Sequence, residues 1–295
     1  MKKLITLMLA LLTLASLLTA CASSTNEGEV VDIAAATATP AAETPTPAAP
    51  EEPTPTPTPE PEKVEVYTEK LAAATEANPD TIGYIAIEST NIDYPIMNSR
   101  QYKVGKSYTY FYNDHDSAMN EAASGSIYAV RSEISQNIAV TGHNSRVSGT
   151  MFHELHHIYD YNKGEKECAY RKCDDELTDV LPKFSADTPW EITVSFGGEE
   201  HTYRAFSVYQ TKAGCDIYET LYDNVWWEGE GKRDYSKTTK EKVQVWIDKQ
   251  LKNSEFDFGT EVTTDDNFLT LYTCGTEKAD ADKNARLYMF FKRVD

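Results

Sequence analysis

Eight short apolar runs set the strongest limit on how this chain can fold. Each is rich in Val, Ile, Tyr or Phe and is bounded by turn residues. They cover residues 82–88, 92–97, 125–130, 137–142, 190–196, 202–210, 268–274 and 286–294. Runs of this length and composition predict strands, and about eight of them predict a barrel or a sandwich. We therefore expect a mostly β fold.

Helices are expected around these strands. The stretch from Tyr67 predicts a short helix that ends before Pro79. A second helix is expected in "GTMFHELHHIYDY" (149–161), with Ser148 or Thr150 as its N-cap and Gly164 at its end. A third, over 235–254, carries these apolar residues among polar ones: Val243, Val245, Trp246, Ile247 and Leu251.

The start of the chain predicts export. A positive start and a short Leu-rich run precede Leu18-Thr-Ala-Cys21, which resembles a bacterial lipobox, so residues 1–21 are expected to be a signal peptide with a lipidated Cys21. Ordinary signal cleavage beside an incidental Cys21 is the alternative. Residues 22–66 contain nine of the thirteen prolines and predict a disordered tether. The folded domain is then expected over 67–295, on the outer face of the cytoplasmic membrane and reaching toward the cell wall.

The net charge of the chain limits the classes of partner that it can bind. Removing residues 1–20, which contain two lysines and no acid, changes the formal net charge from -19 to -21. So large an acidic excess argues against nucleic acid and anionic lipid head groups as partners.

One motif suggests a metal. His153-Glu154-Leu155-His156-His157 matches H-E-x-x-H, in which two imidazoles on one helix face bind zinc beside a general base. A third ligand is hard to find: Asp160 stands where the metzincin extension needs Gly, and Glu176 lies in a crowded acidic stretch. We expect no metal here. Phe152 and Leu155 should instead pack inward, with His153, His156, His157 and Asp160 toward solvent.

Three residues at strand ends suggest covalent catalysis. Cys274 ends one apolar strand, Arg286 begins the next, and His143 follows a third. Strand ends can converge at one mouth of a barrel. There a positive Arg favours a thiolate or a developing oxyanion, and a His supplies acid–base catalysis.

The motifs around these residues resemble those of sortases, cysteine transpeptidases of Gram-positive cell surfaces. "TLYTC" (270–274) matches T-L-x-T-C, Arg286 follows about a dozen residues later, and "GHN" (142–144) follows a hydrophobic strand. The later "GTMF" with Leu155 is similar to class B, as are "NIDYPIM", "GSIY" and the helix before the Cys strand. The resemblance covers about residues 67–295.

The resemblance implies a fold and a reaction. The fold is a closed barrel of about eight strands, with an N-terminal helix and a long helix inserted before the Cys-bearing strand. Cys274 is the nucleophile, His143 the general acid/base, and Arg286, helped by a backbone N–H near Cys274, stabilises the oxyanion or substrate. Thr273, Tyr272 and Asn144 are expected to contact substrate, and no cofactor is expected.

The implied substrates are exported proteins with an LPxTG-like or NPxTN-like C-terminal sorting signal, cleaved after Thr. The acyl acceptor would be an amine of a peptidoglycan precursor or a pilin Lys. Some positions depart from class B: Tyr272 stands where Ser is frequent, and Thr276 where an acid is common, with Glu277 next to it. A catalytically impaired sortase-like lipoprotein therefore remains an alternative, beside a zinc metallopeptidase that uses His153, Glu154 and His157.

The mechanism needs a free thiol at Cys274. Four cysteines besides Cys21 could form two disulfides in an exported chain. Cys168 and Cys173 are the pair we expect if a disulfide exists, and Cys215 stays unassigned.

Overall fold

The computed structural model of the protein describes residues 63–131, 135–164, 167–168, 171–172, 181–211, 226–227, 233–234, 239–275 and 285–295. All of them belong to one unit that spans residues 59–295. No helix within these ranges is long and apolar enough to cross a membrane.

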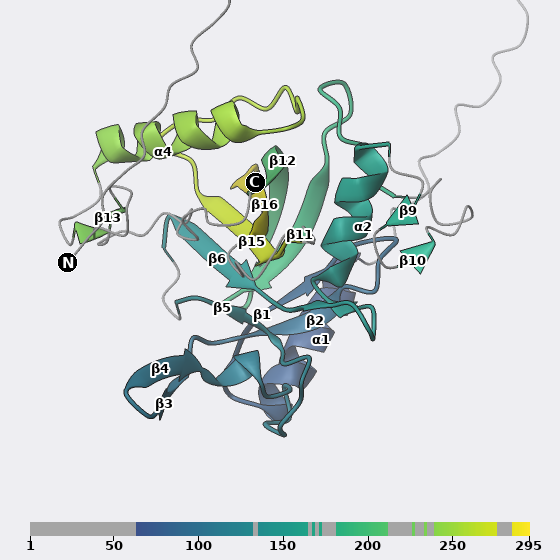
Figure 1. The fold of residues 1–295 in the computed structure, drawn as a ribbon, viewed down its shortest axis with the longest axis vertical. Coiled ribbons are helices and arrows are strands. Elements are labelled where there is room, and N and C mark those ends of the chain that lie inside the picture. The colour runs from purple at the N-terminus through teal and green to yellow at the C-terminus, as the bar shows by residue number, and fades with distance from the viewer. Residues whose placement is uncertain are drawn as a thin grey trace, which may run out of the picture. The chain divides into compact units, whose positions relative to one another are not determined.

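Eight strands close into a barrel at the centre of the fold, which confirms the expected architecture (Figure 1). The strands are β1 (Thr81–Ala86), β2 (Asp93–Met97), β5 (Ile127–Ala129), β6 (Asn137–Thr141), β11 (Glu191–Phe196), β12 (Glu199–Gln210), β15 (Phe268–Cys274) and β16 (Arg286–Arg293). Their order around the barrel is β1-β11-β12-β16-β15-β6-β5-β2. The pairs β6–β15 and β2–β5 are parallel, and the others in the order are antiparallel.

Alternation along the strands separates an inner face from an outer face. On β15 the side chains of Leu269 and Leu271 join the barrel core, whereas Phe268 belongs to a second apolar cluster. On β16 Leu287 and Met289 point to the same core. Residues of opposite parity therefore lie on the outer face, and this parity decides where Cys274 and Arg286 lie.

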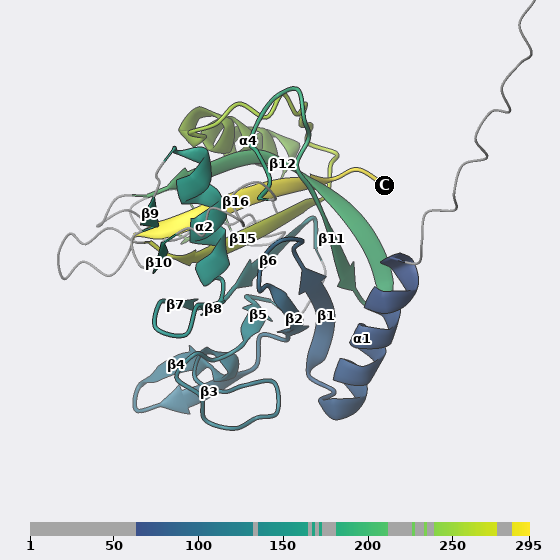
Figure 2. The same ribbon diagram turned by 90° about the vertical axis from the view of Figure 1, so that its right-hand side faces the viewer.

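Two of the helices in the described part of the chain pack on the outside of the barrel. Helix α1 (Lys63–Ala77) begins four residues before the expected start at Tyr67, ends before Pro79 and lies along β1 and β11 (Figure 2). Helix α4 (Lys240–Asn253) covers β12, with Thr239 as its N-cap. Its apolar residues divide: Val243, Trp246 and Ile247 are buried in the second cluster, whereas Val245 and Leu251 are exposed.

Short elements fill the connections. They are β3 (Gln101–Val104), β4 (Ser107–Tyr110), the 3-10 turn η1 (Phe111–Asn113), β7 (Asn144–Ser145), β8 (Thr150–Met151), β9 (Glu167–Cys168), β10 (Arg171–Lys172), β13 (Trp226–Trp227) and β14 (Arg233–Asp234). The β3–β4 hairpin and η1 escaped the sequence analysis. The turn η1 matters because its last residue, Asn113, contacts His143.

Helix α2 (His153–Asn162) corrects two expectations. It begins after Phe152, without a side-chain cap, because Thr150 is part of β8 rather than an N-cap. The expected solvent-facing residues are buried: His153, His156, His157 and Asp160. Phe152 and Leu155 pack in the core as predicted. The error has a physical reason: the polar side of this helix also packs against protein, where its imidazoles find hydrogen-bond partners, so polarity did not mean exposure.

Candidate active site

Cys274 and Arg286 are directly opposite residues in the antiparallel β15–β16 pair. They share the parity of Tyr272 and Tyr288 and so lie on the outer face of the barrel, at the end of the pair. Opposite residues in an antiparallel pair have Cβ atoms roughly 4.5–5.5 Å apart, within reach of a long Arg side chain. Cys274 is an exposed free cysteine, as the mechanism requires. The ladder therefore brings the thiol and the guanidinium together.

His143 reaches the same end of the barrel through a parallel pair. Thr141 of β6 is the partner of Tyr272 in β15, so His143 and Cys274 each stand two residues beyond one row. Side chains reinforce this register: Thr141 Oγ1 donates to the Tyr272 carbonyl at 3.0 Å, and Thr273 Oγ1 donates to the Gly142 carbonyl at 2.7 Å. The three residues expected to form the catalytic set therefore share one end of the barrel.

The imidazole of His143 is held by the backbone. Its Nε2 lies 2.7 Å from the carbonyl oxygen of Asn113. A carbonyl only accepts, so Nε2 carries a proton, and in the neutral ring Nδ1 is the basic nitrogen. If His143 acts as the expected acid–base, Nδ1 is therefore the nitrogen that would exchange the proton. Any residue type could supply this carbonyl, which is why the sequence analysis could not find Asn113.

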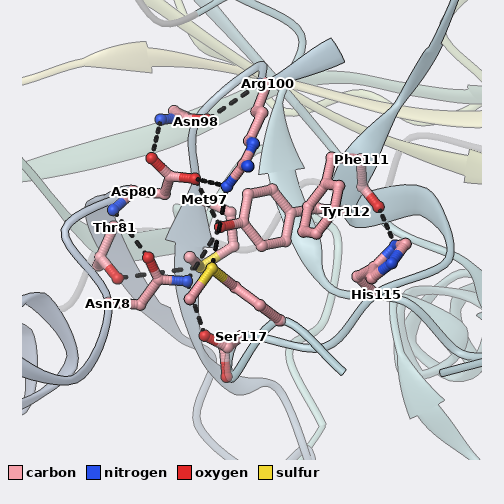
Figure 3. Close-up of polar contacts among 11 residues, drawn as sticks. Asn78, Asp80, Thr81, Met97, Asn98, Arg100, Phe111, Tyr112, His115 and Ser117 are labelled. Atoms are coloured by element: carbon pink, nitrogen blue, oxygen red, sulfur yellow. Dashed lines mark hydrogen bonds and ion pairs between the residues drawn. The ribbon is translucent and has the colours of Figure 1, made fainter. Parts of the chain in front are cut away.

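A polar network, buried at Tyr112 and Asn78 and partly exposed at Asp80, anchors the segment that carries Asn113. Figure 3 shows Asp80 at its centre, accepting from Tyr112 Oη at 2.9 Å, Arg100 Nη1 at 3.1 Å and Asn98 Nδ2 at 3.0 Å. Tyr112 is fully buried, and its hydroxyl also accepts from Asn78 Nδ2 at 2.9 Å. Burial by itself raises the pKa of Asp80, but the hydrogen bonds from Tyr112, Arg100 and Asn98 outweigh it and lower this pKa below its usual value.

A row of three tyrosines and one threonine lies next to the candidate catalytic residues. Tyr128 of β5 pairs with Thr141, which pairs with Tyr272, which pairs with Tyr288, so the row crosses four strands. The rings of Tyr272 and Tyr288 are 5.4 Å apart. Tyr288 is fully buried in the second apolar cluster and Tyr272, packed against that cluster, is partly exposed, so the row supports the strand end that carries Cys274.

Tyr128 belongs to the site electrostatically. Burial raises the pKa of its phenol well above the usual range, the nearby Tyr110 and Cys274 groups add to this, and Arg286 opposes it. These influences place Tyr128 within electrostatic reach of both Cys274 and Arg286. The sequence analysis named Tyr128 only as part of "GSIY". Its position on the outer face of the strand was the feature that could have indicated its closeness to the site.

The carbonyl of Cys274 accepts two side-chain hydrogen bonds. Asn144 Nδ2 donates to it at 3.2 Å, and His156 Nε2 at 2.9 Å. His153 Nδ1 in turn contacts Asn144 Oδ1 at 2.6 Å. Asn144, expected to contact substrate, thus has its amide engaged with protein. Thr273 is only 1% exposed, so we assign it a structural part.

The backbone N–H that was expected to help Arg286 already donates to another group of the protein. Gly275 N–H, the first after the nucleophile, donates to the Ala285 carbonyl at 2.8 Å and is therefore engaged. Thr276 and Glu277 lie outside the described residues. Arg286 stands directly opposite Cys274 at this strand end, and its Nη1 contacts the Ala285 carbonyl at 2.9 Å.

The H-E-x-x-H residues are engaged with one another and with the site. Glu154 Oε2 lies 3.1 Å from His157 Nδ1, and the rings of His153 and His157 are 5.0 Å apart. No group of three or more His, Cys, Asp or Glu within the described ranges is arranged to hold a metal ion. The candidate third ligand Glu176 lies outside those ranges.

Several predictions concern parts of the chain that are not described. The lipidation site Cys21, Cys173 and Cys215 lie outside the described residues, and Cys168 is described only as backbone in β9. The Cys168–Cys173 disulfide therefore stays a prediction.

The arrangement supports acyl transfer. An exposed thiol, an imidazole with one nitrogen fixed and the other available, and a guanidinium opposite the thiol are the parts that covalent catalysis at a carbonyl needs.

The comparisons with known proteins agree with this geometry. No protein-family model matches the chain. Sortase B of Listeria monocytogenes is 23% identical over 214 residues, which cover 71% of this chain and 69% of that protein. The crystal structure of Clostridium perfringens sortase B is 25% identical with a TM-score of 0.53, covering 76% of this chain and 99% of that one. A Staphylococcus aureus sortase B–substrate complex shares the fold, with 18% identity, a TM-score of 0.52, and coverage of 78% and 86%. These matches confirm the resemblance to class B sortases.

Proposed function

We propose that this chain, a homologue of sortase B with the sortase fold, is a cysteine transpeptidase that cleaves a C-terminal sorting signal after Thr. The observation that carries the proposal is the convergence of Cys274, Arg286 and His143 at one barrel end, through the β15–β16 and β6–β15 registers. The comparisons support the family, and the geometry supports the chemistry.

In the first step the Cys274 thiolate attacks the carbonyl carbon of the substrate Thr. Arg286 donates hydrogen bonds to the oxygen that becomes negative, where a preorganised donor lowers the barrier. As the tetrahedral intermediate collapses, the C–N bond breaks, and the imidazolium of His143 gives its Nδ1 proton to the leaving amine. The products are a thioester on Cys274 and the released C-terminal part of the signal.

In the second step an amine from a peptidoglycan precursor or a pilin Lys attacks the thioester. His143 Nδ1 takes the proton that this amine loses, and the thiolate of Cys274 leaves, so the enzyme returns to its first state. The hydrogen bond from Nε2 to Asn113 holds the imidazole in the orientation needed in both steps.

The proposed setting follows from the start of the chain. Cys21 would be lipidated and would hold the protein on the outer face of the cytoplasmic membrane, with residues 22–66 as a tether toward the cell wall. Metabolic labelling with an alkyne fatty acid in a Gram-positive host tests this. Labelling that survives in Cys21→Ser would refute the anchor.

The reaction itself can be tested with fluorogenic peptides that carry LPxTG-like and NPxTN-like signals. Cys274→Ala should abolish cleavage and thioester formation, whereas His143→Ala and Arg286→Ala should each lower kcat/KM by roughly 10²–10⁴. His201→Ala and Arg204→Ala serve as matched controls. Both residues lie in β12: His201 pairs with Asp295 at the C-terminus, and Arg204 pairs with Glu191 in β11.

Inhibitors separate the competing functions. A thiol-alkylating reagent should abolish turnover, and a metal chelator should leave it unchanged. Loss of turnover with the chelator alone would favour the zinc metallopeptidase. A correctly folded wild type that forms no thioester with any signal peptide would favour the catalytically impaired homologue.

A further inference from the structure

His156 occupies a costly position for a histidine. Its side chain is 1% exposed, Nε2 donates to the Cys274 carbonyl at 2.9 Å, and Nδ1 is buried without a hydrogen-bond partner among the described residues. A buried acceptor left without a donor costs free energy, and an apolar side chain would avoid that cost. Since the ring is half-satisfied, its contribution to the fold alone does not explain its presence beside the nucleophile.

The peptide unit between Cys274 and Gly275 is held at both of its polar ends. His156 and Asn144 donate to its carbonyl oxygen, and its N–H donates to the Ala285 carbonyl at 2.8 Å. Arg146 Nη2 also donates to the Gly275 carbonyl at 3.1 Å. A peptide unit is planar, so fixing both ends fixes the orientation of the backbone next to the Cys274 side chain.

Two features keep His156 a hydrogen-bond donor to the Cys274 carbonyl throughout the reaction. The carbonyl can only accept, so the proton lies on Nε2. The pKa of His156 is lowered to about 3: burial is the largest cause, the hydrogen bond to the Cys274 carbonyl opposes it, and the nearby His153, Arg146 and His157 add to the lowering. The ring is therefore neutral at neutral pH and acts as a donor without exchanging protons.

We propose that His156 is a positioning residue for Cys274: it fixes the peptide unit that follows the nucleophile and thereby aims Sγ at the substrate carbonyl. Asn144 is the second donor, and the contact from His153 Nδ1 fixes which way its amide faces. The inference rests on the proposed role of Cys274 as nucleophile. It gives His156, which occupies an x position of the H-E-x-x-H match, and His153, its first position, a part that needs no metal.

Three variants of the full chain test this. His156→Leu removes the donor and keeps an apolar side chain of similar size, and Asn144 still donates to the carbonyl, so the protein should fold. His156→Gln keeps an N–H donor. His157→Leu is the matched control, because His157 is also buried in α2 and has a ring nitrogen without a hydrogen-bond partner among the described residues, but its described contacts are with Glu154 and the ring of His153 rather than with the Cys274 carbonyl. Thermal unfolding of all three establishes that they are folded.

Kinetics should separate positioning from activation. A misaimed nucleophile lowers the rate of attack without weakening binding, so His156→Leu should lower kcat for peptide cleavage on the order of tenfold and leave KM within about twofold. Alkylation of Cys274 by iodoacetamide should change less than about twofold, since a small reagent does not need an aimed thiol. His156→Gln should recover most of kcat, and His157→Leu should resemble wild type.

Hydrogen exchange gives a readout that needs no substrate. Loss of one hydrogen bond should loosen the Cys274–Gly275 peptide unit, so the Gly275 amide of ¹⁵N-labelled His156→Leu should exchange roughly fivefold to tenfold faster. The Gln variant and the His157→Leu control should stay near the wild-type rate.

The outcomes are decisive in both directions. The inference is overturned if His156→Leu lowers kcat no more than His157→Leu does, if Gln is no better than Leu, or if the Gly275 amide exchanges at the wild-type rate. Should the wild type cleave no signal peptide, the proposed function fails, and the exchange rates alone still decide whether His156 holds this peptide unit.

Discussion

Thr273 Oγ1 donates a 2.7 Å hydrogen bond to the carbonyl of Gly142, which joins the residue before Cys274 to the residue before His143. Thr273 lies in β15 and Gly142 directly follows β6, and these two strands are parallel partners that are far apart in the sequence. This bond therefore links the backbone segments that carry Cys274 and His143, the proposed nucleophile and acid–base, in addition to the backbone ladder.

Replacing Thr273 with Val should reveal this coupling. The change keeps the shape of a buried side chain but leaves the Gly142 carbonyl without its donor, so we expect a loss of about 1–3 kcal/mol in the free energy of unfolding. Urea unfolding measures it, and kcat should fall as well. Thr193→Val is the control, because Thr193 is partly exposed in β11, and β12 and β16 separate it from β15. Equal effects of the two changes would contradict the coupling.

Arg286→Lys should test whether charge alone suffices at this position. Lys keeps the positive charge but lacks the planar fork of donors that Arg presents. We expect kcat/KM for signal-peptide cleavage to fall at least about tenfold, because the transition-state oxygen loses an oriented donor. Arg204→Lys, in an exposed pair with Glu191, should change it little. Full activity of Arg286→Lys would show that a point charge is enough.

Gly275→Ala should disturb the strand end that carries the nucleophile. An added Cβ would lie 2.9 Å from Ala285 Cβ and 3.1 Å from the Ala285 carbonyl carbon, so the backbone after Cys274 must shift. We expect a loss of about 1–3 kcal/mol in stability and a lower kcat. The double change Gly275→Ala with Ala285→Gly removes the nearer obstacle and should restore part of both. No recovery in the double variant would place the strain elsewhere.

Asp80 should make stability depend on pH in the acid range. Its pKa is lowered in the folded state by the hydrogen bonds from Tyr112, Arg100 and Asn98, against the opposing effect of burial (Figure 3). A carboxyl with a lowered folded pKa stabilises the fold above its unfolded pKa, which is about 4, and this contribution is lost as pH falls below that value. Wild type should therefore lose stability below about pH 4 more steeply than Asp80→Asn does.

The same variant should cost stability at neutral pH. Asp80→Asn weakens charged hydrogen bonds, so we expect a loss of about 1–3 kcal/mol at pH 7, measured by urea unfolding. Asp265→Asn removes an exposed pair with Lys240 and should cost less than about 1 kcal/mol. Parallel pH profiles for wild type and Asp80→Asn would contradict the assignment.

Much of the fold could be predicted because strands are encoded locally. Residues 268–274 and β15 coincide, and the other seven predicted runs each became a barrel strand within a few residues. The β3–β4 hairpin was missed because its strands are exposed and carry no apolar run. The presence of helix α2 was predicted, but its N-cap and its burial were wrong, since a short polar sequence does not show what packs against it.

The sequence by itself determined the chemistry-bearing residues and the end of the strand on which each stands. Motif spacing identified Cys274, His143 and Arg286, because catalysis restricts both residue type and position after a strand. Only the tertiary structure decided which groups hold them. The Asn113 carbonyl, the Asp80 network and the donor from His156 come from segments whose contacts depend on how the barrel closes. Every residue type has a backbone carbonyl, so the sequence does not show which carbonyl accepts a hydrogen bond. The residue type of a histidine likewise does not show whether its side chain is buried or exposed.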